Sequence, residues 1–173
     1  MRAQHQALQA RRPIAFVSDT ACDLPDELVL QYDIKLVPTQ LIVDEHDATT
    51  SQPAPQAFTD AFRDAARAGN HVIAVILSNA LSGTYGNAEA AARRFDAGRV
   101  TVVDSRHVTL GEGLLVVRGV ELAAAGWSGD AIVKELELVA RYRPMQCLVT
   151  PITPVIAAHA GIGAWGVFYQ NED

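Results

Sequence analysis

Hydroxyl side chains gather directly after an apolar run that ends at Leu77. The next six residues, Ser-Asn-Ala-Leu-Ser-Gly, place Ser78 and Ser82 before an alanine-rich stretch that predicts a helix over about 83–95. The free N–H groups at the start of a helix attract anions. Ser82 can help to bind such an anion, or it can cap its own helix. Both interpretations stay open at this point.

A second hydroxyl cluster, Thr-Thr-Ser-Gln-Pro-Ala-Pro at 49–55, is expected to be a polar loop that offers Thr50 as a donor. No Lys or Arg occurs between Leu36 and Phe62 or between Ala68 and Ala92. A doubly charged phosphate usually recruits such a cation. The clusters therefore suit a single carboxylate or an uncharged polar group, and the sequence motifs of nucleotide-binding loops are absent.

Ser82 also permits a nucleophile hypothesis, with His159 as base and Asp19 as orienting acid. Against it, Ser82 does not lie in a G-x-S-x-G elbow. A small serine hydrolase that uses Ser82 is kept as an alternative function. The remaining histidines lack the spacing of metal ligands, so we expect no metal site.

The elements that must position these groups alternate between short apolar runs and amphipathic segments. Strands are predicted at 13–18, 34–43 with an interruption at Pro38, 71–77 and 99–104. Helices are predicted after Asp23 and at 55–67, 83–95, 108–125 and 128–143, with Asp23 and Ser128 as the N-caps of the first and the last. This alternation predicts an α/β fold, a parallel sheet between two layers of helices. In such sheets, ligands bind outside the carboxyl ends of the strands. The loops 18–25, 78–83 and 104–107, which include Thr20 and Ser78, should therefore share one rim.

Composition narrows the classes of protein. The chain has 173 residues, 49% of them hydrophobic, and a formal net charge of −6. This acidic balance argues against nucleic acid as a partner. No segment reaches the ~18 apolar residues of a membrane span. Residues 1–12 are expected to be a disordered basic tail and not a secretory signal.

Two cysteines, Cys22 and Cys147, do not form a disulfide framework, so a cytoplasmic location is expected. Asp19 and Asp23 should raise the pKa of the Cys22 thiol. We expect one α/β domain over 13–143. Residues 144–173 differ in pattern and predict one or two strands around a His-Gly-rich loop.

Five segments in order resemble the DegV family of bacterial fatty-acid-binding proteins, and the domain resembles that family's N-terminal domain. These are FVSDTACDLP (16–25), TTSQPAP (49–55), LSNALSGTYGNAEAAA (77–92), VTVVDSRHVTLGEG (100–113) and HAGIGAWGVFY (159–169).

The resemblance implies a non-catalytic carrier that holds a long-chain fatty acid, such as palmitate or oleate, in an apolar tunnel between two domains. It implies that Thr50 and Ser82 bind the carboxylate, with His159 near this head group. Ser78 and Thr20, on the predicted rim, complete the candidate set. The resemblance also implies a fatty-acid kinase as a partner and no cofactor beyond the lipid.

The chain departs from the family pattern after position 143. Only about fifteen residues precede His159, where the family has most of a second domain, and Ile162 replaces a proline of the final motif. The tail could therefore lie in an open groove or be covered by a second copy of the chain in a homodimer. A degenerate scaffold that binds no lipid is the remaining alternative.

Overall fold

The computed structural model describes residues 14–43, 48–68 and 71–142. The strands are β1 (Ile14–Asp19), β2 (Lys35–Val37), β3 (Gln40–Val43), β4 (Ala48–Ser51), β5 (His71–Ile76) and β6 (Val100–Asp104). The helices are a short 3-10 helix η1 (Thr20–Cys22), α2 (Asp26–Tyr32), α3 (Pro55–Ala68), α4 (Thr84–Ala92), α5 (Leu110–Ala124) and α6 (Gly129–Tyr142). The expected tail at 1–12 and the segment 144–173, with His159, lie outside the described residues.

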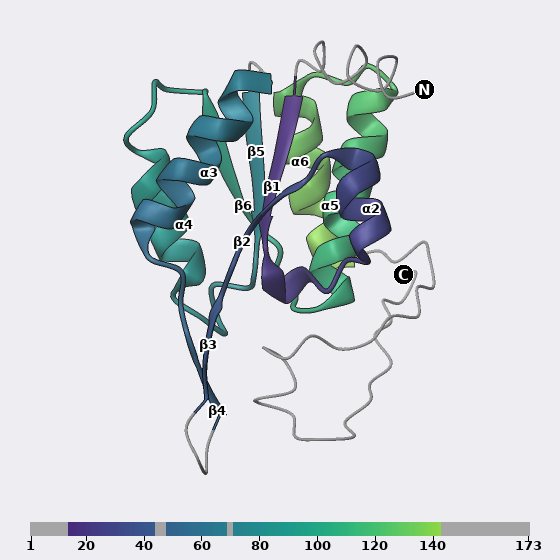
Figure 1. Ribbon diagram of the computed structural model, residues 1–173. Helices are drawn as coiled ribbons and strands as arrows, with labels where there is room; N and C mark the ends of the chain where they lie inside the picture. Colours follow the sequence, from purple (N-terminus) through teal and green to yellow (C-terminus); the bar gives the residue numbers. More distant parts are fainter. Residues whose placement is uncertain (1–13, 44–47, 69–70, 143–173) are drawn as a thin grey trace.

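Four strands form a parallel sheet in the order β2-β1-β5-β6. Helices α3 and α4 cover one face of this sheet, and α5 and α6 cover the other (Figure 1). The predicted α/β class with three layers is confirmed. The chain leaves β1 toward one edge of the sheet and β5 toward the other, so the strand order reverses between these two neighbours.

Side chains of β5 alternate between the two layers of helices. Val72, Ala74 and Ile76 pack in the cluster under α3 and α4. Ile73 and Val75 pack in the cluster under α5 and α6. Because both faces are covered, the strand has no polar side, which explains its continuous apolar sequence.

The outer helices bury stripes with helical spacing. In α3 the buried residues include Phe58, Phe62 and Ala65, and Phe62 also contacts Phe95 at a ring-centroid distance of 6.1 Å. Ser128 caps α6 as predicted, because its Oγ accepts a hydrogen bond from Ala131 N at 3.3 Å. No helix in the described ranges combines the length and apolar character needed to cross a bilayer.

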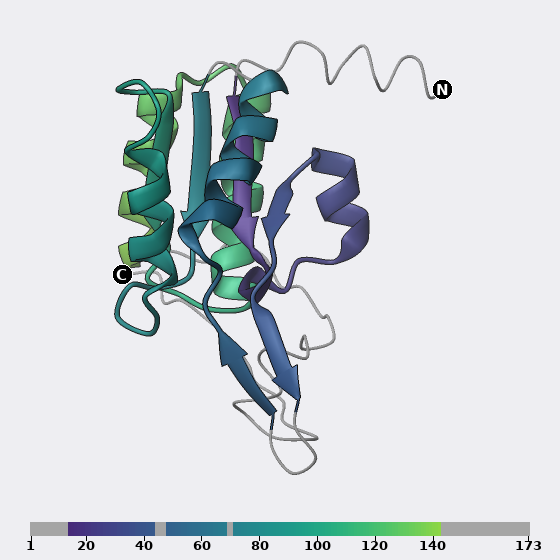
Figure 2. The same ribbon diagram turned by 60° about the vertical axis from the view of Figure 1, so that its left-hand side comes forward.

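The expected loop at 49–55 is wrong in its first part. Residues 48–51 form β4, which pairs antiparallel with β3 in a hairpin that extends beyond the carboxyl ends of the sheet strands (Figure 2). Leu41 lies opposite Thr50 in this pairing. The segment is polar, but β-branched threonines favour extended backbone, and β3 supplies the hydrogen-bonding partner.

The prediction that Asp23 caps the helix after it, α2, is also wrong. Asp23 ends η1 in the left-handed region with φ 49°, and Pro25 is the N-cap residue of α2. The side-chain cap in this region belongs to Asp19, whose carboxylate accepts from Ala21 N at the start of η1.

Gly113 and Gly86 provide a matched test of packing at helical glycines. A Cβ at Gly113 would lie 2.6 Å from the carbonyl oxygen of Cys22, whereas one at Gly86 would meet nothing within 4 Å. We expect Gly113→Ala to lower the free energy of unfolding by about 1–3 kcal/mol. Gly86→Ala should raise it by about 0.5–1 kcal/mol, because alanine favours helix. Urea denaturation measures both, and equal effects would contradict the packing.

Candidate functional site

The candidate site lies where β1 and β5 end side by side, at the reversal of strand order. This is the position at which open parallel sheets form a crevice for ligands. Backbone hydrogen bonds join the three predicted rim loops there: Ser78 N donates to His107 O at 2.9 Å, and Thr109 N donates to Ala21 O at 2.8 Å. The prediction that these loops share one rim is confirmed.

Asp19, the last residue of β1, ties two of these loops together. Its Oδ1 accepts from Ala21 N at 2.9 Å, and its Oδ2 accepts from Leu77 N at 3.0 Å. The side chain has no exposed surface. Leu77 opens the hydroxyl-rich segment after β5, so this carboxylate fixes where that segment begins.

Ser78 shapes the segment from within. Its carbonyl oxygen accepts from Leu81 N at 3.0 Å and Ser82 N at 3.2 Å, and its Oγ accepts from Ala80 N at 3.3 Å. Only 5% of Ser78 is exposed. Its hydroxyl is therefore engaged in the turn that presents Ser82.

Ser82 is half-buried and lies just before α4. Its Oγ is 2.9 Å from Thr84 Oγ1 and accepts from Thr84 N at 3.3 Å. The N-cap residue itself is Gly83, which offers no side chain. Ser82 thus satisfies one helix N–H, as the capping interpretation requires, and still lies at the rim.

The second hydroxyl cluster lies beside the first. Asn87 in α4 donates from Nδ2 to Pro53 O at 3.0 Å. The Gln52 side chain lies so close to Gly83 that an added Cβ would be 2.7 Å from Gln52 Oε1. Thr50, half-buried, is two residues before Gln52. The hairpin end that carries Thr50 is therefore held against the start of α4.

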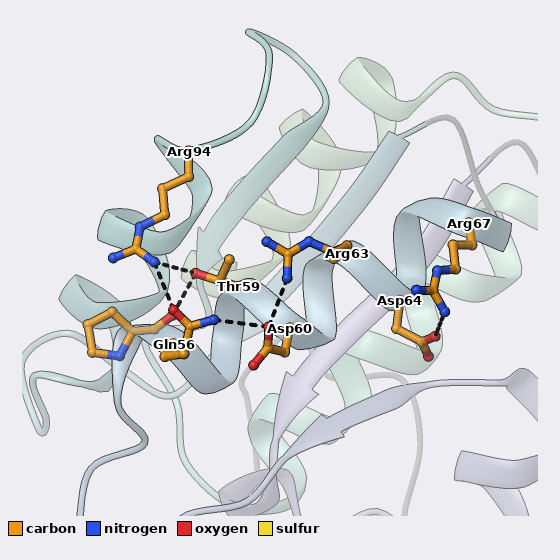
Figure 3. Close-up of polar contacts among 8 residues, drawn as sticks. Gln56, Thr59, Asp60, Arg63, Asp64, Arg67 and Arg94 are labelled. Atoms are coloured by element: carbon orange, nitrogen blue, oxygen red, sulfur yellow. Dashed lines mark hydrogen bonds and ion pairs between the residues drawn. The ribbon is translucent and has the colours of Figure 1, made fainter.

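The first turn of α3, which follows this contact, is fixed to the end of α4 by Arg94 (Figure 3). Arg94 Nη1 donates to Gln56 Oε1 at 3.1 Å and to Thr59 Oγ1 at 3.3 Å. Gln56 in turn donates to Asp60 Oδ1 at 3.0 Å. Contacts at both ends of α4 thus hold the 49–55 motif itself and the start of the helix that follows it.

The hydroxyl of Thr20 has a backbone partner in the structure, and its contact with a head group stays a prediction. Its Oγ1 accepts from Thr39 N at 3.0 Å, so it connects η1 to the link between β2 and β3. It anchors the base of the hairpin. His159 lies outside the described residues, so its place in the site stays a prediction.

Asp19 and Ser82, the two described members of the hypothetical Ser-His-Asp triad, form hydrogen bonds to other groups. Asp19 is buried with both oxygens on backbone N–H groups, and Ser82 Oγ is bonded to Thr84. Within the described part of the chain, no group of three or more His, Cys, Asp or Glu side chains could hold a metal ion.

Glu112 is a site residue that the sequence reading missed. It is fully buried in α5, and its Oε1 lies 2.9 Å from Ser18 Oγ. Burial and then the charge of Asp19 raise the pKa of Glu112 well above its ordinary value. The available signal was its spacing, because Glu112 lies three and four residues before the buried Leu115 and Val116.

The predicted rise in the pKa of the Cys22 thiol is confirmed in direction, but Asp23 is not among its causes and Asp19 is a minor one. Burial, followed by the charge of Glu112, raises the pKa of its thiol from 9.0 to about 12, with a smaller effect from Asp19.

This shift predicts an unreactive thiol. In a Cys147→Ser variant, which leaves Cys22 as the single cysteine, we expect a disulfide reagent at pH 8 to react with folded protein at least about a thousandfold more slowly than with urea-unfolded protein. Three pKa units reduce the thiolate fraction by that factor, and burial adds to it. Rapid labelling under native conditions would contradict this environment.

Comparison with known proteins gives a consistent result. A family model described as "Uncharacterised protein, DegV family" matches residues 45–145. A DegV domain-containing protein of Caldanaerobacter subterraneus is 34% identical over 152 residues, which cover 75% of this chain and 54% of that protein. A DegV domain-containing protein of Deinococcus radiodurans is 48% identical over 91 residues, 53% of this chain and 32% of that protein.

Solved structures show the same similarity. A DegV family protein from Thermus thermophilus, described by its fatty acid binding, is 34% identical with a TM-score of 0.69, and the match covers 75% of this chain and 54% of that one. DegV from Bacillus subtilis, a fatty acid binding protein, is 27% identical with a TM-score of 0.68, over 76% of this chain and 55% of that one. The chain thus spans about half the length of these relatives.

Proposed function

Since the chain belongs to the DegV family, we propose that it is a non-catalytic carrier of a long-chain fatty acid in the cytoplasm. The observation that carries this proposal is the contact between the 49–55 motif and the start of α4, which places two uncharged hydroxyl clusters beside one helix N-terminus. Relatives described as fatty acid binding proteins share this fold.

The head group is proposed to bind at Thr50 and Ser82, with His159 nearby. A single carboxylate matches neutral hydroxyl donors and a helix N-terminus, because it needs fewer cationic partners than a phosphate. Ser78 and Thr20 keep supporting roles in this proposal, because their hydroxyls are bonded to the backbone of the loops that carry the two binding residues.

The tail supplies most of the affinity. Burial of a methylene group is worth about 0.8 kcal/mol, so a tail of ~14 methylenes gains roughly 10 kcal/mol before ordering costs. Head-group contacts then mainly set the orientation of the ligand.

Covering the tail needs a further surface. The chain spans about half the length of its relatives, and we propose that a second copy of the chain closes over the bound tail. A bound tail left uncovered on one copy would present apolar surface to water, which favours such self-association. Light scattering after size-exclusion chromatography should show that palmitate converts monomer to dimer. A lipid-loaded monomer would contradict this arrangement.

We further propose that a fatty-acid kinase is the partner that receives the ligand. A carrier that binds the carboxylate at the rim of the sheet keeps the reactive end of the lipid near the protein surface, where a second enzyme can reach it.

Lipid extraction tests the central proposal directly. Purified protein is denatured, extracted with organic solvent and analysed by mass spectrometry, and the melting temperature is measured with and without palmitate or oleate. We expect co-purified long-chain acids and a rise in melting temperature, since a ligand stabilises the state that binds it. If no lipid is extracted and the melting temperature does not change, the proposal of a fatty-acid carrier is refuted.

Paired substitutions test the head-group assignment. The double change Thr50→Ala, Ser82→Ala should weaken palmitate binding by about 2 kcal/mol, roughly 30-fold. Thr50→Ser, which keeps the hydroxyl, should retain affinity and serves as the matched control. Calorimetry measures both variants. Unchanged affinity of the double variant would place the carboxylate elsewhere.

A further inference from the structure

A buried carboxyl pair lies directly beneath the candidate site and takes no part in the proposed ligand contacts. Asp19 at the end of β1 and Glu112 in α5 are both without exposed surface. Their side chains interact with each other. Two ionised carboxylates in contact inside a protein are strongly disfavoured, so the proton content of this pair bears on the loops it supports.

The hydroxyl of Ser18 identifies where a proton lies. Ser18 Oγ is 2.8 Å from the carbonyl oxygen of Val75 and 2.9 Å from Glu112 Oε1. A serine hydroxyl has one hydrogen, and a carbonyl oxygen can only accept. Ser18 therefore donates to Val75, and the second short contact is a hydrogen bond only if Glu112 donates to Ser18.

The second oxygen of Glu112 supports the same assignment. Glu112 Oε2 is buried and has no hydrogen-bond donor among the residues that the structure describes. An ionised carboxylate would leave half of its charge on this oxygen without solvent or a donor, at a large cost. A neutral carboxyl group needs only its O–H to be satisfied.

Asp19 has the opposite environment. Burial raises the pKa of Asp19 above its ordinary value, but two backbone N–H groups donate to its two oxygens and oppose this rise by stabilising the ionised form. Among the residues that the structure describes, the other ionisable groups that act on Glu112 or lie beside it are Asp23 and the Cys22 thiol, and the charge of Asp23 also favours a proton on Glu112. The pair thus consists of an anion at Asp19 and a proton donor at Glu112.

We propose that Glu112 is protonated in the folded protein, donates to Ser18, and positions the contact between Asp19 and Leu77 that sets the head-group rim. An ionised Glu112 would repel Asp19 and move it away from Leu77 N, which leads directly into Ser78. The positioning role rests on the proposed function. The protonation state does not, so the two can fail separately.

Carbon-detected NMR of protein labelled at the glutamate side-chain carboxyl carbon tests the protonation state without any lipid. The Glu112 signal, assigned by its loss in Glu112→Gln, should have the chemical shift of a carboxylic acid at pH 7. An ionised Glu112 at pH 7 would overturn the proposal.

Unfolding equilibria provide an independent measurement with a defined sign. The unfolded chain ionises Glu112 near its ordinary pKa of 4.5, whereas the folded protein keeps the proton. As the pH rises above this value, the ionisation of Glu112 in the unfolded chain therefore increases the ratio of unfolded to folded protein by up to about tenfold per pH unit. Glu112→Gln should remove that slope and Glu121→Gln should not. Equal slopes in wild type and Glu112→Gln would overturn the assignment.

Conservative rescue tests the positioning role. Glu112→Gln keeps a donor for Ser18 and should bind palmitate within about twofold of wild type, with the Leu77 amide signal unchanged. Glu112→Leu, which has no donor, should lose at least about tenfold in affinity and shift that signal. If Glu112→Leu does not fold, Ser18→Ala is used in its place, because it removes the acceptor of the same hydrogen bond and should have the same effects.

Three results would separate the explanations. If the variant without the donor binds as wild type does, or if Glu112→Gln loses as much as Glu112→Leu, the positioning role is overturned. If wild type itself binds no palmitate, the proposed function fails, while the Leu77 amide and the carboxyl carbon signal still decide the state of the pair.

Discussion

One buried carboxylate, that of Asp19, holds together the part of the molecule on which everything else depends. Neighbouring parallel strands end at the same edge, but their loops run in opposite directions and have no sheet hydrogen bonds to join them. Asp19 accepts from a backbone N–H of each loop, so it links the two loops directly, in addition to the backbone hydrogen bonds that join them to His107 and Thr109. A buried charge is tolerated there because both oxygens have donors.

Around this contact the chain places neutral hydroxyls and few cations. Ser78 and Thr20 use their hydroxyls to shape the loops, and Ser82 binds the first turn of α4. Affinity for an anion must then come from helix N–H groups and hydroxyl donors, which favours a single negative charge. The protonated Glu112 fits this electrostatic setting, because another buried anion beside Asp19 would oppose both the loop contact and an incoming carboxylate.

The hairpin of β3 and β4 shows that a polar segment, which the sequence predicts to be a loop, can form a strand. Its second strand is polar, yet the Asn87 contact with Pro53 and the close approach of Gln52 to Gly83 hold its end against the body of the protein. These contacts join residues far apart in sequence, and they bring the two hydroxyl motifs together. The exposed ion pairs along α3, such as Arg63 with Asp60, contribute little by comparison.

The sequence by itself determined the layers and the rim. Continuous apolar strands such as β5 and the helical spacing of Phe58 and Phe62 are local patterns, and a parallel sheet necessarily gathers the loops that follow its strands. Only the tertiary structure decided that Asp19 caps η1, whereas Asp23 does not cap α2. It also decided that Thr20 accepts a hydrogen bond at the base of the hairpin and that Glu112 lies against Ser18. Each of these depends on which side chain reaches a distant backbone group, and burial, not local propensity, selects that partner.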